Sequence, residues 1–176
     1  TPTDSSAASD VYKRQILMRA NPTLQVKIKF SSAPFTSIYV YDKKSISTNL
    51  CVFYHPVSNS NKWNLMCTDE YEFKNNLINI LKIQEKVPAV IAGDINMDWS
   101  KNTPDVNDYK ALFQKYAQAT DKPTFYRSNG NRKPTTSIID IVYLKGLTFT
   151  SKTFNGRIFA GNDGHEIIHI TTETGI

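Results

Sequence analysis

A continuous apolar segment near the middle of the chain stops abruptly at polar residues. Residues 87–92 read VPAVIA, and the sequence GDINMD follows directly. A short apolar run that ends at a glycine is typical of a buried strand. Residues i and i+2 of an extended chain point the same way, so Asp94 and Asn96 are predicted to project from one face. The segment therefore predicts a strand that delivers a carboxylate and an amide together at the edge of the core.

The remaining patterns predict an α/β (α+β) domain in which two layers of β-sheet are flanked by helices. Strands are expected at 24–30 (half-buried through Val26, Ile28 and Phe30), 36–42, 48–56, 87–94, 137–146, 147–154 and 165–173. Helices are expected at 71–86, capped by Thr68 or Asp69, and at 104–118, with a turn-rich connection at 121–136. Because strands outnumber helices and the two alternate loosely, layered sheets are favoured. The domain is expected to span 16–176, and residues 1–15 are interpreted as a tail or sequence scar.

Composition narrows the class of protein. The hydrophobic content of 40% and the charged content of 21% are those of an ordinary globular domain, and no apolar run approaches the roughly 20 residues that span a bilayer. A membrane partner is therefore not expected. The formal net charge of +5 suits a polyanionic partner without requiring one. Cys51 and Cys67 have neither zinc-site nor disulfide-scaffold spacing, which favours an intracellular setting.

Two further polar positions interrupt apolar strands. Asp140 lies inside SIIDIVYL, where a charge costs several kcal/mol unless it is paired or bound to a metal. Asp163 and His165 precede the last strand, and histidine can change its charge near neutral pH. Considered one at a time, such residues have ordinary structural explanations. An aspartate at a strand end is commonly a turn residue, Asp140 can form a structural ion pair, and a lone histidine is commonly at the surface. Their joint pattern, with Asp94 and Asn96, favours a catalytic site instead.

Four segments carry a family resemblance. VIAGDINMD resembles the G-D-x-N signature of the endonuclease/exonuclease/phosphatase (DNase I-like) superfamily, and SIIDIVYL and NDGHEIIHI resemble its later strand motifs. CVFYHPVSNSN is similar to the tyrosine-proline segment of endonuclease domains from non-LTR retrotransposons. The four motifs occur in the family's order over residues 49–172. The resemblance implies a DNase I-like fold that is incomplete at its N-terminus, because the family's early asparagine and metal-binding glutamate have no counterpart.

The resemblance also implies the roles of individual residues. Asp94 would orient or deprotonate the attacking water, Asn96 would bind the scissile phosphate, and Asp140 would hold the imidazole of His165. Tyr54 would lie beside the phosphate, with Mg²⁺ or Mn²⁺ as the cofactor. The family's metal-binding aspartate corresponds to Gly164, so Asp163 is the nearest candidate ligand and the other ligands are missing.

A basic and aromatic connection is the expected contact with nucleic acid. Arg127, Arg132 and Lys133 lie there beside Phe125 and Tyr126. Such residues can grip a phosphate backbone, although an ordinary solvated loop explains them as well.

Three functions remain open from the sequence. The resemblance favours a Mg²⁺-dependent endonuclease that nicks DNA, of retroelement type, in the nucleus or elsewhere inside the cell, with a reverse transcriptase as a possible fusion partner. The second is a truncated, non-catalytic relative that at most binds nucleic acid. The third is a phosphatase of the same superfamily.

Overall fold

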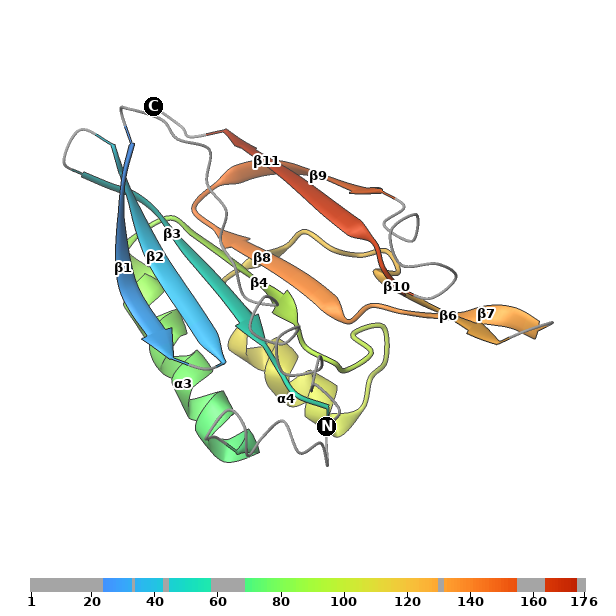
Figure 1. Ribbon diagram of the computed structural model, residues 1–176. Helices are drawn as coiled ribbons and strands as arrows, with labels where there is room; N and C mark the ends of the chain where they lie inside the picture. Colours follow the sequence, from blue (N-terminus) through green and yellow to red (C-terminus); the bar gives the residue numbers. More distant parts are fainter. Residues whose placement is uncertain are drawn as a thin grey trace, which may run out of the picture.

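A six-stranded mixed sheet forms the centre of the protein. The computed structural model describes residues 24–32, 34–42, 45–57, 69–129, 132–154 and 164–173. The tail expected at 1–15, Asp163, Cys67 and Thr68 lie outside the described residues. The strand order is β1-β2-β3-β4-β8-β5 (Figure 1). These strands are β1 (Leu24–Ser32), β2 (Phe35–Asp42), β3 (Ser45–Tyr54), β4 (Ala89–Asp94), β8 (Asp140–Lys145) and β5 (Ala117–Gln118).

The apolar segment that ends at Asp94 forms the central strand β4. It pairs in parallel with β3 and antiparallel with β8. The register sets Asp94 opposite Tyr54 on one side and opposite Asp140 on the other. Ile91 is fully buried, because both faces of the sheet are covered at this strand. The end of β4 therefore brings three of the predicted site residues to one edge of the sheet.

Two helices cover one face of this sheet (Figure 1). Asp69 is the N-cap of helix α3 (Glu70–Ile83), and its side chain accepts a hydrogen bond from the Glu72 N–H. A short 3₁₀ turn (Gln84–Lys86) follows the helix. Thr103 is the N-cap of helix α4 (Pro104–Leu112). Apolar residues of both helices pack on the sheet: Phe73, Leu77, Ile80, Leu81, Val106 and Tyr109.

The second predicted helix is shorter than expected. We predicted 104–118, but α4 ends at Leu112 and a turn follows. The reason is tertiary, because Ala117 and Gln118 pair with β8 as the edge strand β5. Sheet pairing there overrides the helical spacing of the side chains.

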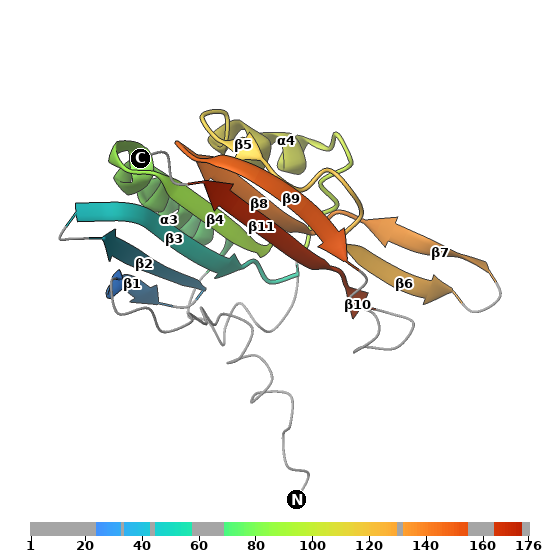
Figure 2. The same ribbon diagram turned by 90° about the horizontal axis from the view of Figure 1, so that it is seen from above.

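A second, smaller sheet covers the opposite face. Strands β9 (Thr148–Phe154) and β11 (Ile167–Glu173) pair antiparallel and lie across β4 and β8 (Figure 2). Apolar residues fill the space between the two sheets: Ala119, Val142, Leu144, Val90, Ala92, Phe149, Ile168 and Ile170. The predicted fold class of two β layers flanked by helices is thus confirmed.

The turn-rich connection predicted at 121–136 is instead a β-hairpin. Strands β6 (Phe125–Asn129) and β7 (Arg132–Ser137) pair antiparallel and extend away from the two sheets (Figure 2). The short strand β10 (Gly164–His165) pairs with β6, so the strand predicted at 165–173 is broken at Glu166 into β10 and β11. This break places His165 and the apolar residues of β11 in different sheets.

The strand expected at 24–30 does form, but not as a half-buried one. The side chains of Val26 and Ile28 are 48% and 67% exposed. Strand β1 is the edge of the sheet, and within the described part of the chain its only partner strand is β2. Alternation alone therefore predicted the strand correctly and its burial wrongly.

Candidate active site

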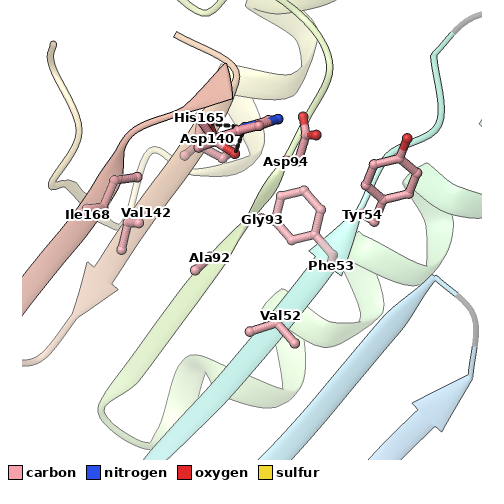
Figure 3. A pocket seen from close by; sticks show the side chains of 11 residues that line it. Val52, Phe53, Tyr54, Ala92, Gly93, Asp94, Asp140, Val142, His165 and Ile168 are labelled. Atoms are coloured by element: carbon pink, nitrogen blue, oxygen red, sulfur yellow. Dashed lines mark hydrogen bonds and ion pairs between the residues drawn. The ribbon is translucent and has the colours of Figure 1, made fainter. Parts of the chain in front are cut away.

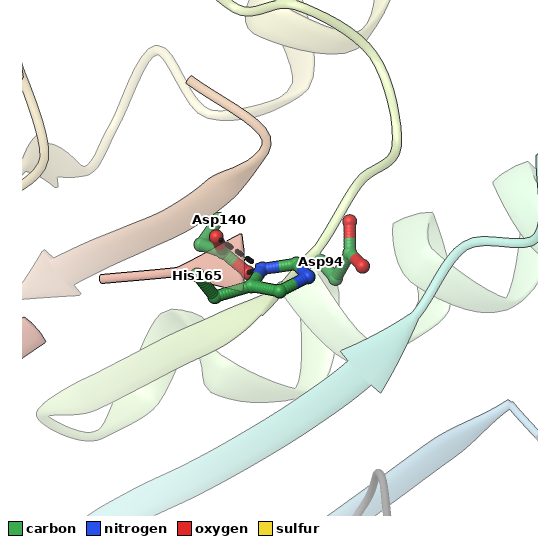
Figure 4. A group of neighbouring side chains, drawn as sticks. All are labelled: Asp94, Asp140 and His165. Carbon is green, nitrogen blue, oxygen red and sulfur yellow. Dashed lines mark hydrogen bonds and ion pairs between the residues drawn. The ribbon is translucent and has the colours of Figure 1, made fainter. Parts of the chain in front are cut away.

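Two carboxylates and one histidine meet where three strands end. Asp94 closes β4, Asp140 opens β8, and His165 lies in β10. The Asp140 carboxylate lies 2.8 and 3.1 Å from Nδ1 of His165 (Figure 4). The other ring nitrogen lies on the side of Asp94, as Figure 4 shows. One potential ligand atom from each of the three side chains falls within 4.8 Å of the others.

Asp140 is the first residue of its strand, although the sequence placed it in the middle of one. Its side chain is 20% exposed and that of His165 is 47% exposed. The carboxylate is therefore partly hydrated, and its partner is the histidine. A carboxylate on Nδ1 fixes the ring so that Nε2 faces away from it, and it stabilises the protonated imidazole.

A buried threonine that sequence analysis did not single out holds this pair in place. Thr124 is fully buried, and its hydroxyl oxygen accepts hydrogen bonds from the N–H groups of Ile139 (3.1 Å) and Asp140 (2.9 Å). Its carbonyl accepts from the N–H of Glu166 at 2.7 Å, one residue after His165. Thr124 thereby connects the backbones that carry the acid and the histidine. No motif marks it, since the contact depends on strands far apart in sequence.

The residues after β4 form a tight turn and do not continue the strand. Asn96 has a φ of 50°, a left-handed conformation that asparagine tolerates better than most residues. Its N–H donates to the Asp94 carboxylate at 2.9 Å, and its side-chain Nδ2 donates to the His55 carbonyl at 2.6 Å. The prediction that Asp94 and Asn96 share one face of an extended strand is therefore wrong. The two are brought together by the turn, which the fully buried Ile95 anchors.

Asp98 stabilises the same loop. Its carboxylate accepts from the N–H and hydroxyl of Ser100 and from the N–H of Ile138. Burial raises its pKa, but these hydrogen bonds and the Lys101 ammonium outweigh burial and hold the pKa below its usual value. Asp98 therefore joins the loop after β4 to the segment before β8.

A cavity of about 460 Å³ opens beside the acid and histidine cluster (Figure 3). Its inner wall is apolar, formed by residues of β3, β4, β8 and β11 such as Val52, Ala92 and Val142. Asp94, Asp140, His165 and Tyr54 supply the polar groups of its lining. Tyr54 lies on the opposite side of Asp94 from His165 (Figure 3).

The predicted basic contacts lie on the hairpin next to His165. Phe125 pairs with His165 across β6 and β10, and their rings meet edge-on at 5.0 Å. The Arg127 guanidinium, on an exposed residue, lies 5.8 Å from the Phe125 ring. Arg132 and Lys133 lie on β7, and their side chains are outside the described part of the structure.

The glycine before His165 takes a conformation that most residues avoid. Gly164 is buried and has a φ of 151°. An aspartate at this position, as in the family pattern, would therefore be strained. The alternative ligand Asp163 is among the residues that the structure does not describe.

The fold is DNase I-like, as predicted. The endonuclease domain of TRAS1, a telomere-specific non-LTR retrotransposon, superposes with a TM-score of 0.61 at 11% identity, covering 87% of this chain and 70% of that domain. TDP2 from D. rerio, in complex with a single-stranded DNA product, gives 0.52 at 15% identity, covering 85% and 67%. The human nocturnin catalytic domain gives 0.49 at 12% identity, covering 84% and 60%. No protein-family model and no curated protein sequence matches the chain.

The donor chemistry of the cluster suits a divalent cation. Carboxylate oxygens are the ligands that Mg²⁺ and Mn²⁺ prefer, and Asp94 and Asp140 supply them from facing strands. Nδ1 of His165 bonds Asp140, and its Nε2, on the side of Asp94, makes the histidine the third member of the group. Within the described residues, this is the one group of three or more acidic, histidine or cysteine side chains close enough to hold a metal. No described helix is long and apolar enough to cross a membrane.

Proposed function

We propose that this chain belongs to a metal-dependent phosphodiesterase that hydrolyses DNA, as a nicking endonuclease of retroelement type. The observation that carries the proposal is the Asp140–His165 pair at 2.8 Å with Asp94 beside it, in a cavity at the end of the central strand. Hydrolysis of a phosphodiester requires a positioned water and groups that stabilise the additional negative charge of the transition state. The cluster contains candidates for both.

Each residue of the cluster has a distinct proposed role. Asp94 orients the attacking water and accepts its proton, and the Asn96 N–H holds the Asp94 carboxylate in place. His165, kept in one orientation by Asp140, donates a hydrogen bond to the phosphoryl oxygens as charge builds up on them. Asn96 uses one amide hydrogen for the His55 carbonyl, which leaves the second for the phosphate.

A divalent cation completes the proposal. Asp94 and Asp140 would hold it, and it would supply positive charge that offsets the charge of the phosphate. Mg²⁺ and Mn²⁺ are the ions that suit oxygen ligands of this kind.

DNA is the proposed substrate because of the surface beside the cluster. The β6–β7 hairpin carries Arg127 next to the Phe125 ring, which contacts His165, so a backbone bound at the cluster would extend over basic and aromatic groups. The net charge of +5 favours a polyanion. The similarity to the TRAS1 endonuclease domain supports the retroelement type, in which a reverse transcriptase would be the fusion partner.

The test is nicking of supercoiled plasmid DNA with Mg²⁺ or Mn²⁺. We expect Asp94→Ala and His165→Ala to lower the rate at least about 100-fold, because each removes a general acid–base or charge-stabilising group. Two matched controls, Asp121→Ala and His169→Ala, replace the same residue types at exposed positions outside the cavity lining and should leave the rate unchanged. Undiminished nicking by both active-site variants would contradict the assignment.

Metal titration separates catalysis from mere nucleic-acid binding. Calorimetry with Mn²⁺ should show binding by the unmodified chain and weaker binding by Asp94→Ala. Binding of an oligonucleotide without metal binding or nicking would favour the non-catalytic relative instead.

A further inference from the structure

A side-chain network that joins a buried histidine to a half-exposed glutamate lies behind the turn that carries Asp94 and Asn96. The imidazole of His55 is 2% exposed, and its Nε2 lies 2.9 and 3.2 Å from the two carboxylate oxygens of Glu70. The hydroxyl of Tyr109 donates to Glu70 at 2.5 Å. The network therefore joins the end of β3 to the first turn of α3 and to α4.

Aromatic contacts fix the orientation of the His55 ring. The rings of Phe73 and Tyr109 meet it edge-on, with centroids 4.7 and 5.7 Å away. These two ring contacts and the hydrogen bond to the Glu70 carboxylate together hold the imidazole in one orientation. His55 is also absent from the lining of the 460 Å³ cavity. Its side chain is therefore not part of the surface that a bound phosphate would meet.

The main chain of His55, in contrast, contacts the active-site turn twice. Its N–H donates to the Asp94 carbonyl at 2.8 Å, and its carbonyl accepts from Asn96 Nδ2 at 2.6 Å. Asn96 in turn donates its N–H to the Asp94 carboxylate. Pro56 follows and restricts His55 to extended backbone, which favours a single direction for that carbonyl.

We infer that His55, anchored by Glu70 and Tyr109, is a positioning residue that sets the location of Asn96 and through it of the Asp94 carboxylate. The consequence for catalysis rests on the proposed function, whereas the effect on Asn96 does not. The His55 side chain acts indirectly. Any residue at position 55 has the main-chain carbonyl that Asn96 contacts, but the imidazole determines where that carbonyl lies. Glu70 is the link to helix α3, and the hydrogen bond from His55 holds the pKa of its carboxyl below its usual value.

The direct test reads the Asn96 side chain by NMR. The Asn96 amide signal is identified by its loss in Asn96→Ser. We expect Glu70→Ala and Tyr109→Phe to move this signal, and Glu70→Gln, which keeps an acceptor oxygen, to restore most of its original position. The control is Glu72→Ala, which removes a carboxylate from the same first turn of α3 and so has the same effect on the helix dipole.

Nicking kinetics complete the test, with a thermal melt to establish that each variant is folded. For Glu70→Ala we expect kcat for nicking to fall about 10- to 100-fold with little change in KM, because the loss is one of alignment. Tyr109→Phe removes only a hydroxyl and guards against a variant that fails to fold. An Asn96 signal that stays in place in folded Glu70→Ala overturns the inference. Absence of nicking by the unmodified chain contradicts the proposed function instead, and the NMR comparison still decides the positioning.

Discussion

Replacing Gly93 with alanine is expected to destabilise the strand that delivers Asp94. Gly93 lies opposite Phe53 in the parallel pair of β3 and β4. An added Cβ would lie 2.5 Å from the Phe53 carbonyl oxygen and 2.7 Å from two atoms of its ring. Nonbonded carbons normally lie about 3.5–4.0 Å apart, so the ring contact is too short by about 0.8 Å or more.

Neither partner of the clash can move away easily. The oxygen belongs to the backbone of a paired strand, and the Phe53 ring is 2% exposed and packs beside Phe35 and Phe73. Overpacking of a core costs about 1–3 kcal/mol, and a backbone partner puts this site at the upper end. The smaller entropy of the unfolded alanine variant offsets about 0.4–1 kcal/mol. We therefore expect a net loss of about 2 kcal/mol, or about 4–8 °C in Tm for a chain of this size.

The measurement is urea unfolding followed by circular dichroism, with a parallel thermal melt. Gly146→Ala is the control, because its Cβ would meet nothing closer than 3.5 Å and the cost comes only from its φ of 66°. That cost is about 1–2 kcal/mol before the same entropic offset, so the control should lose less than Gly93→Ala. A Gly93→Ala protein within about 0.5 kcal/mol of the unmodified chain would refute the packing of β3 against β4 described above.

Further predictions concern the core, the thiol, the network and the histidine. Leu77→Ala, at a fully buried position, should lower the free energy of unfolding by about 2–5 kcal/mol in urea. Burial raises the pKa of the Cys51 thiol to about 12, so peptide mapping should show iodoacetamide modifying Cys51 only after unfolding. The hydrogen bond with His55 lowers the pKa of Glu70, so the stabilisation by its carboxylate is present above the ordinary pKa of 4.5 and is lost as the pH falls through the lowered pKa. In Glu70→Gln the free energy of unfolding should therefore depend less on pH over that acidic range. His165→Ala, at a half-exposed side chain, should change Tm by less than about 2 °C, and a larger loss would indicate a structural role.

The sequence predicted the elements of the site better than their geometry. The apolar run of 87–92 identified the central strand, since only a buried strand or helix accommodates such a run. The i and i+2 argument for Asp94 and Asn96 failed because it assumed an extended chain, and Asn96 has a positive φ. Asp140 was placed inside a strand that in fact begins with it, because periodicity does not mark where pairing starts.

The connection at 121–136 also differs from its prediction because of tertiary pairing. Residues 121–136 carry turn-forming residues and were predicted as a loop, yet they pair as a hairpin and receive β10 as a third strand. Pairing of this kind depends on segments distant in sequence, which local propensity does not describe.

The residue types available for chemistry and the strands that present them could be predicted from local sequence, because hydrophobic periodicity and polar interruption are local properties. Which of these residues meet depends on the packing of distant segments. The strand register set Asp94 opposite Asp140, and the pairing of β10 with β6 brought His165 to within 2.8 Å of that carboxylate. Glu70 is the clearest case. No sequence motif marks it, and only the packing of α3 and α4 against the end of β3 connects it, through His55, to the active-site turn.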